Sequence, residues 1–175
     1  MDPAVPESEI RRACGETEFP ELGVIEQVWD VDPIPTDEVT DRAAAAVDAL
    51  DFDSVPEGGE VAVGAGSRGI ANLPEIVGGV VRGVREQGYD PFVFPAMGSH
   101  GGATAQGQRE KLATLGVTEE SVDCEIRATM DVEQVGTTPE RDVAVYADAY
   151  AAAADAIVMT NRIKPHTDFT GEVES

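Results

Sequence analysis

Histidine, lysine and cysteine are all scarce in this chain of 175 residues, which has two of each. Cys14 and Cys124 form no CxxC pair, so the usual spacing of a zinc site is absent, and a disulfide is neither indicated nor excluded. No apolar run reaches the roughly 18 residues of a membrane-spanning helix. The N-terminus lacks the basic region and apolar stretch of a secretory signal, so we expect a cytoplasmic protein.

Positive charge is also in short supply. The sequence carries 34 acidic residues against 12 basic ones, which gives a formal net charge of −22. Such a surface repels nucleic acids and anionic membranes, so neither is expected as a partner. The acids are dispersed among apolar segments, as in halophilic proteins of a salt-rich cytoplasm, where the Debye length falls to roughly 3 Å near 1 M salt. We therefore interpret the charge as an adaptation to the solvent and not as a functional site.

Apolar strand-like segments alternate with helical ones along the chain. Strands are predicted at 24–29, 61–66, 91–97 and 156–160, and shorter β-like stretches at 122–127, 131–136 and 142–146. Helices are predicted at 36–50, with Thr36 as N-cap, at 73–88, at 104–116 and in the alanine-rich segment before residue 156. The internal glycines of the helix at 73–88 would permit close packing on a sheet.

This alternation predicts the fold class and the domain organisation. Short apolar strands that are buried on both faces indicate a mostly parallel sheet with helices on both sides, a Rossmann-like α/β fold. Residues 1–20 are expected to form an N-terminal arm, and residues 21–175 a single domain.

Three unusual loops each follow a predicted strand. AGSRGI follows VAV, GSHGGAT follows FVFPAM, and NRIKPHTDF follows AIVMT. Ligands bind at the carboxyl ends of the strands in an open parallel sheet, so these loops should share one edge. That edge would bring Arg68, His100 and His166 into one cleft.

The first loop suits an anion. Gly66 and Gly69 let a ligand approach the backbone, beside the hydroxyl of Ser67. Arg68 can hold a carboxylate or a phosphate through two parallel hydrogen bonds. The loop is neither a GxGxxG motif nor a Walker loop. Its structural alternative is a tight turn with a solvated arginine.

The second and third loops each carry a histidine. His100 lies between Ser99 and Gly101, where it can be a general acid, a general base or a metal ligand, or can simply bond to loop carbonyls. In the third loop Asp168 is close enough in sequence to orient His166, and Lys164 adds positive charge. The structural alternative there is a basic exposed loop.

Two histidines that face one ligand suit a reaction with a base on one side and an acid on the other. Racemisation at a carbon bearing a hydroxyl and a carboxylate is such a reaction, and an arginine would bind the carboxylate. The hydrogen on that carbon is weakly acidic, so a hydride route through an electrophilic cofactor is easier than proton abstraction.

The segments VAVGAGSRGIANLPEIV, FPAMGSHGGATAQGQ and TNRIKPHTDFTGEVES, in this order, resemble the N-terminal domain of the lactate racemase family. These enzymes are racemases and epimerases that depend on a nickel-pincer nucleotide, and the similarity covers roughly residues 20–175. The resemblance implies a two-domain α/β enzyme with its active site between the domains. It also implies that His100 and His166 exchange the hydroxyl proton of a 2-hydroxy acid and that Arg68 binds a carboxylate or phosphate. The nickel would accept and return the hydride.

The sequence departs from that family in ways that narrow the expectation. Ala65 stands where lactate racemases have an aspartate, so a substrate other than lactate is expected. The family's cofactor-linking lysine and nickel-binding histidine would lie beyond Ser175, in a missing C-terminal domain, and Lys164 does not match that lysine. No metal ligand is therefore expected within this chain, which would be inactive alone. Two alternatives stay open: a different phosphate-using enzyme, and a non-catalytic anion- or nucleotide-binding domain.

Overall fold

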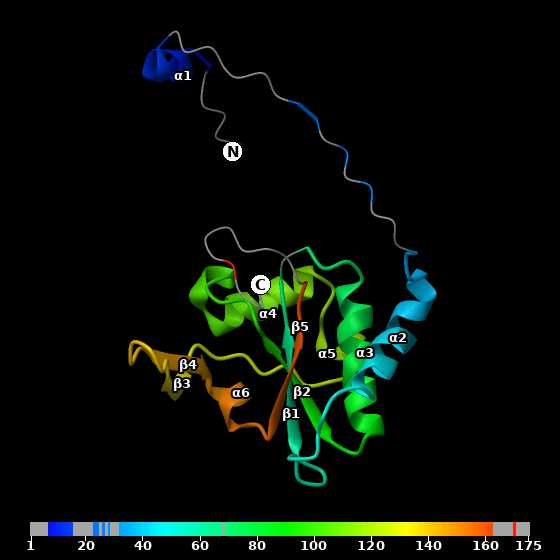
Figure 1. Cartoon of the computed structure of the whole chain (residues 1–175). Coiled ribbons are helices and arrows are strands. Elements are labelled where there is room, and N and C mark those ends of the chain that lie inside the picture. The colour runs from blue at the N-terminus through cyan, green and yellow to red at the C-terminus, as the bar shows by residue number, and fades with distance from the viewer. Residues whose placement is uncertain are drawn as a thin grey trace. The chain divides into compact units, whose positions relative to one another are not determined.

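The computed structural model describes residues 7–15, 23, 24, 26, 28, 32–67, 69–162 and 170. The chain divides into two units, Met1–Pro33 and Ile34–Ser175. The described part of the first unit contains one helix, α1 (Glu7–Cys14). The second unit contains every other helix and strand of the described residues (Figure 1).

Strands and helices alternate through the second unit. The strands are β1 (Glu60–Ala65), β2 (Asp90–Pro95), β3 (Val132–Thr137), β4 (Ala144–Asp148) and β5 (Ala156–Thr160). The α-helices are α2 (Val39–Val47), α3 (Leu73–Glu86), α4 (Ala105–Thr114), α5 (Glu119–Val122) and α6 (Ala149–Ala153), and the 3₁₀ turns are η1 (Thr36–Glu38) and η2 (Gly101–Ala103). None of the helices in the described ranges is long and apolar enough to cross a bilayer.

The strands β2, β1 and β5 form a parallel sheet in that order, with β1 in the centre. Ala65, the last residue of β1, pairs with Pro95 at the end of β2 and with Thr160 at the end of β5. The carboxyl ends of all three strands therefore lie level at one edge. The predicted α/β class with a parallel sheet is confirmed. The strands β3 and β4 form a separate antiparallel pair.

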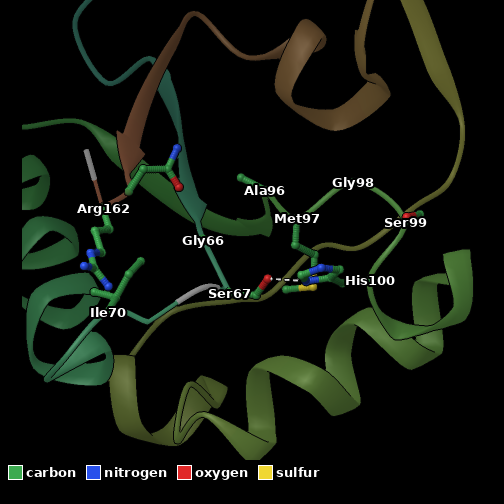
Figure 2. Close-up of a pocket in the computed structure, with 10 residues that line it drawn as sticks. Gly66, Ser67, Ile70, Ala96, Met97, Gly98, Ser99, His100 and Arg162 are labelled. Carbon is green, nitrogen blue, oxygen red and sulfur yellow. Dashed lines mark hydrogen bonds between the residues drawn. The ribbon is translucent and has the colours of Figure 1, made fainter. Parts of the chain in front are cut away.

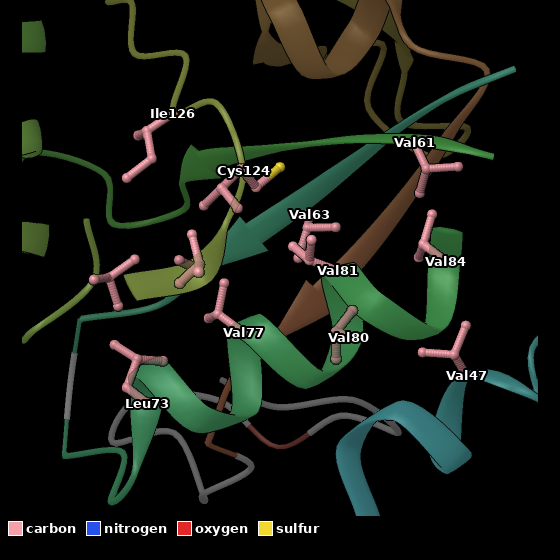
Figure 3. Packing of buried hydrophobic residues seen from close by; sticks show 14 of the residues in the cluster. Val47, Val61, Val63, Leu73, Val77, Val80, Val81, Val84, Cys124 and Ile126 are labelled. Carbon is pink, nitrogen blue, oxygen red and sulfur yellow. The ribbon is translucent and has the colours of Figure 1, made fainter. Parts of the chain in front are cut away.

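Buried side chains pack on both faces of the parallel sheet. On one face Val61 and Val63 of β1 lie in the same cluster as Val77 and Val84 of α3, all of them fully buried (Figure 3). A smaller cluster joins Ala62, Phe92 and Phe94 of the sheet to Ala151 of α6. Helices thus flank the sheet, and the larger core lies on the α3 side.

The helix α3 approaches α2 closely through two of its glycines. A β-carbon at Gly79 would collide with the carbonyl oxygen of Thr40, and one at Gly83 would lie 2.7 Å from that of Ala44. A β-carbon at Gly78 would lie 3.8 Å from its nearest neighbours, which are backbone atoms of Ser121 and Val122. The prediction that these glycines serve packing on a sheet is therefore wrong about the partner, which is another helix.

The strand predicted for 24–29 is not formed at the residues of it that the structure describes. Val24, Glu26 and Val28 have no regular secondary structure, and Val24 is 99% exposed. An apolar stretch becomes a strand only when a neighbouring strand satisfies its backbone and its side chains find a face to pack on.

Two other details differ from the sequence prediction. Pro35, with φ −55° and ψ 140°, takes the non-helical N-cap conformation, so Thr36 is the first residue of η1 and not the cap. Residues 122–127 form no strand, because α5 occupies the start of the segment, and only a single parallel bridge joins Ile126 to Val93.

Cys124 is a buried thiol in the core beneath β2 (Figure 3). Its Sγ donates a hydrogen bond of 3.1 Å to the carbonyl of Pro91, and burial raises the pKa of the thiol. The thiolate is the reactive form, so Cys124 should resist a disulfide reagent while the exposed Cys14 reacts quickly. In the native chain at mildly alkaline pH we expect one thiol per chain to react rapidly with the reagent. The second thiol should react only after unfolding in urea. Rapid reaction of both thiols in the native chain would contradict the burial of Cys124.

Candidate functional site

A cavity of about 460 Å³ lies at the carboxyl edge of the parallel sheet (Figure 2). The loops that follow β1, β2 and β5 all contribute to its lining, which consists of Gly66, Ser67, Ile70, Ala96, Met97, Gly98, Ser99, His100, Asn161 and Arg162. Described residues of the three loops thus come together at one edge, as expected for an open parallel sheet.

A hydrogen bond between Ser67 and His100 joins two of these loops. The Oγ of Ser67 lies 2.7 Å from Nδ1 of His100 (Figure 2). Both side chains are half-buried, and both line the cavity. The two residues lie just beyond neighbouring strands, Ser67 after β1 and His100 after β2, so the pairing of these strands brings them together.

The loop that carries His100 has an unusual backbone. Gly98, Gly101 and Gly102 have φ values of +59°, +69° and +67°, which glycine adopts at little cost. Gln108 of α4, only 4% exposed, donates a hydrogen bond of 2.8 Å from Nε2 to the carbonyl of Gly98. The glycines permit the path of the loop, and the buried amide of Gln108 fixes its backbone at Gly98.

The loops after β1 and β5 are held against each other. The amide of Gly66 donates to the carbonyl of Thr160 at 3.2 Å, and the Thr160 hydroxyl donates to the carbonyl of Gly64 at 2.6 Å. A β-carbon at Gly66 would collide with the side-chain oxygen of Asn161. The lack of a side chain at Gly66 lets Asn161 approach this closely, and the two hydrogen bonds hold the backbone directly before Ser67.

The polar lining of the cavity favours an anion. The chain has a net charge of −22, yet no aspartate or glutamate is among the described residues that line the cavity. Arg162 and Asn161 contribute hydrogen-bond donors, and Nη1 of Arg162 lies 3.4 Å from the carbonyl oxygen of Gly69. A guanidinium, an amide and an imidazole that line one cavity suit a carboxylate or a phosphate.

Asn161 and Arg162 were not among the predicted site residues. They are the first two residues after β5, at the same edge as the other loops. The strand-end rule that drew attention to the histidines also applies to them. That rule was the signal that could have found them.

The structure describes six of the ten predicted site residues. Four of them line the cavity: Gly66, Ser67, Ser99 and His100. Gly69 and Gly101 belong to the same loops, with φ values of +58° and +69°. The other four lie outside the described residues: Arg68, Lys164, His166 and Asp168. The convergence of His100 with His166 and Arg68 therefore stays a prediction.

The described residues of the cavity offer hydrogen-bond donors that suit an anion. Within the described ranges, no three or more histidine, cysteine, aspartate or glutamate side chains are placed to hold a metal. The hydroxyl, amide and guanidinium groups of the cavity match a carboxylate or the phosphate of a nucleotide. They fit the phosphate end of a pincer nucleotide, whose nickel ligands the family resemblance places beyond Ser175.

Fold and site together define an α/β protein with a ligand cavity at the carboxyl edge of a parallel sheet. None of the family models, curated proteins or solved structures compared with the chain matches it. The resemblance to the lactate racemase family therefore rests on the three loop motifs alone. The function has to be argued from the chemistry of the cavity.

Proposed function

We propose that this chain is the catalytic-histidine domain of a racemase or epimerase acting on a small 2-hydroxy acid. One observation carries the proposal. His100, with its Nδ1 bonded to Ser67, lines a cavity whose described lining also includes Arg162 and Asn161 but no acidic side chain. A proton-exchanging group beside anion-binding groups is what a substrate with a hydroxyl and a carboxylate requires. The loop motifs supply the reaction class.

His100 would exchange the proton of the substrate hydroxyl. Ser67 engages Nδ1, so we assign the exchange to Nε2. As a general base, His100 takes the hydroxyl proton while the hydrogen on the same carbon departs as a hydride, and the substrate becomes a 2-oxo acid. When the hydride returns to the opposite face, a protonated histidine gives the proton back. His166 is assigned this role for the second stereoisomer.

The substrate carboxylate would be held by the guanidinium of Arg162 and the amide of Asn161, with Arg68 as a further candidate. A fixed carboxylate lets the carbon present either face without release of the molecule. When bound, the nickel-pincer nucleotide would supply the electrophilic acceptor for the hydride. The backbone around Gly66 is the part of this chain that would hold its phosphate. A C-terminal domain would complete the site.

A second candidate function is a non-catalytic domain that binds a small anion or a nucleotide. The absence of acidic side chains from the described lining of the cavity favours it as much as it favours the enzyme. Such a domain needs Arg162 and Asn161 but makes no use of proton exchange at His100. Substitution of His100 therefore separates the two functions.

Replacement of His100 by alanine should lower kcat of the nickel-loaded full-length enzyme by at least about 100-fold, the contribution usual for a positioned acid or base. The protein would be produced together with the pincer-cofactor biosynthesis proteins and checked for stoichiometric nickel. Conversion of single enantiomers of 2-hydroxy acids would then be followed by chiral chromatography. Gln106→Ala, at an exposed position on α4, is the matched control.

The two functions predict different results for this variant. Full activity of His100→Ala would rule out its acid/base role. A wild-type protein that binds 2-hydroxy acids without converting any of them, and whose affinity is unchanged in the variant, would favour the anion-binding domain. Unfolding in urea should show a stability within about 1 kcal/mol of the wild type, because the ring is half-buried and little apolar surface is lost.

A further inference from the structure

We infer that Ser67 is the positioning residue of His100, and that its hydroxyl holds the ring in every protonation state that the reaction requires. The inference rests on the proposed function for its consequence in turnover. The contact itself can be tested without substrate or cofactor. Ser67 acts here through His100 and is not assigned a bond to the reacting atoms.

The geometry of the contact supports a fixed orientation of the ring. The distance of 2.7 Å between Oγ and Nδ1 is that of a well-formed hydrogen bond. The backbone on the serine side is anchored to β5 by the amide of Gly66, and the loop on the histidine side is anchored to α4 through Gln108. Two anchored loops thus meet at this bond, which fixes the position of Nδ1.

A hydroxyl is a chemically distinctive partner for an imidazole because it both donates and accepts. When Nδ1 has no proton, the serine hydroxyl donates to it. When Nδ1 carries a proton, in the other tautomer or in the imidazolium, the serine oxygen accepts. Only the hydroxyl hydrogen has to rotate between these states, so no heavy atom moves.

A carboxylate in place of Ser67 would behave differently. It only accepts, so it would fix the proton on Nδ1 and favour the charged ring, as the aspartate of a Ser-His-Asp triad does. A racemase must use one imidazole as a base in one direction and as an acid in the other. A hydroxyl partner can bond to the imidazole in both its base role and its acid role. This property suits a reaction that interconverts stereoisomers of similar energy in both directions.

The contact can be tested by nitrogen NMR of the ¹⁵N-labelled 175-residue chain. The sequence has only two histidines, so the spectrum contains two rings, assigned by a His100→Gln variant. Ring nitrogen shifts distinguish a protonated from a bare nitrogen. We expect Ser67→Ala to shift Nδ1 of His100 and to change its tautomer ratio, and Ser67→Thr to restore the wild-type spectrum. Ser67→Asp should drive the ring to the tautomer protonated on Nδ1.

Ser99→Ala is the matched control, because it removes the hydroxyl next to His100 in sequence and leaves Ser67 in place. It should leave the nitrogen shifts of His100 unchanged. A Ser67→Ala spectrum identical to that of the wild type would overturn the inference. So would covalent labelling of Ser67 by a fluorophosphonate probe, since Ser67 would then be a nucleophile activated by His100.

The consequence for turnover is measured in the nickel-loaded enzyme. Ser67→Ala should lower kcat by about 10- to 100-fold with little change in KM, because a misplaced ring slows proton transfer without removing the carboxylate ligands. Ser67→Thr should retain most of the activity. Wild-type kcat in Ser67→Ala would overturn the role in turnover. If even the wild-type protein converts no 2-hydroxy acid, the proposed function fails, while the NMR result still decides the role of Ser67.

Discussion

Replacement of Gly101 by alanine is expected to lower the free energy of unfolding by about 3 kcal/mol or more and to displace the loop that carries His100. Gly101 has φ +69°, a conformation that costs an L-residue about 1 to 2 kcal/mol. Its β-carbon would also collide with the main chain of Gly107 in α4. Overpacking of this kind costs about 1 to 3 kcal/mol, and here the obstacle is backbone that cannot change rotamer.

The neighbouring residue provides the control for this experiment. Gly102 has φ +67°, but a β-carbon there would meet no atom within 4 Å. Gly102→Ala should therefore cost only the conformational part, about 1 to 2 kcal/mol. Urea unfolding gives the free energy of unfolding of both variants. The difference between the two values measures the contact between the His100 loop and α4. Equal losses in the two variants would mean that this contact is absent in solution.

Two adjacent glycines of α3 are expected to respond to alanine in opposite directions. At Gly79 the β-carbon would collide with the carbonyl of Thr40 and lie 2.7 Å from the β-carbon of Ala43, so α2 would be pushed away. The net loss should be about 2 kcal/mol. At Gly78 the nearest atoms, in Ser121 and Val122, stand at 3.8 Å. Alanine there should stabilise the protein by about 0.5 to 1 kcal/mol through its better helix propensity.

The opposite signs make this pair informative. Both substitutions add one methyl group to the same turn of the same helix, so a general effect on helix propensity is common to both. Urea unfolding of both variants gives the two changes in the free energy of unfolding. The dependence of that free energy on urea concentration should be the same in both variants and in the wild type. Destabilisation at both positions would show that α5 also presses on α3 at Gly78. Stabilisation at both would show that α2 does not pack across Gly79.

Much of the second unit could be predicted because its elements carry strong local signals. The strand β5 occupies residues 156–160 as predicted, since AIVMT is a short apolar run that follows a break in a helix. The helix α3 begins at Leu73, with Pro74 in its first turn, and the chain leaves it at Gly88 with φ +89°. Each of these signals lies within the segment that it predicts.

The features that were missed depend on segments far apart in the sequence. Ser67 and His100 are 33 residues apart, and their contact follows from the register of β1 against β2, which no local pattern specifies. The strand predicted at 24–29 is absent at its described residues, Val24, Glu26 and Val28, because strand formation needs a partner elsewhere in the chain. Gly79 was recognised as a packing glycine, yet whether a sheet or a helix would meet it is a property of the tertiary structure.

The position of β1 in the centre of its sheet has a consequence for synthesis of the protein. Val61 pairs with Pro91 on one side and with Ala156 on the other. Ribosomes add about 5 to 20 residues per second, so β5 emerges roughly 5 to 20 s after β1. Throughout that interval the edge of β1 that later pairs with β5 has unpaired backbone groups. Its valines, which are buried in the folded protein, are also less protected. Other chains can add to an open strand edge of this kind. The growing polypeptide therefore spends seconds as a two-stranded intermediate that a cell must protect from aggregation.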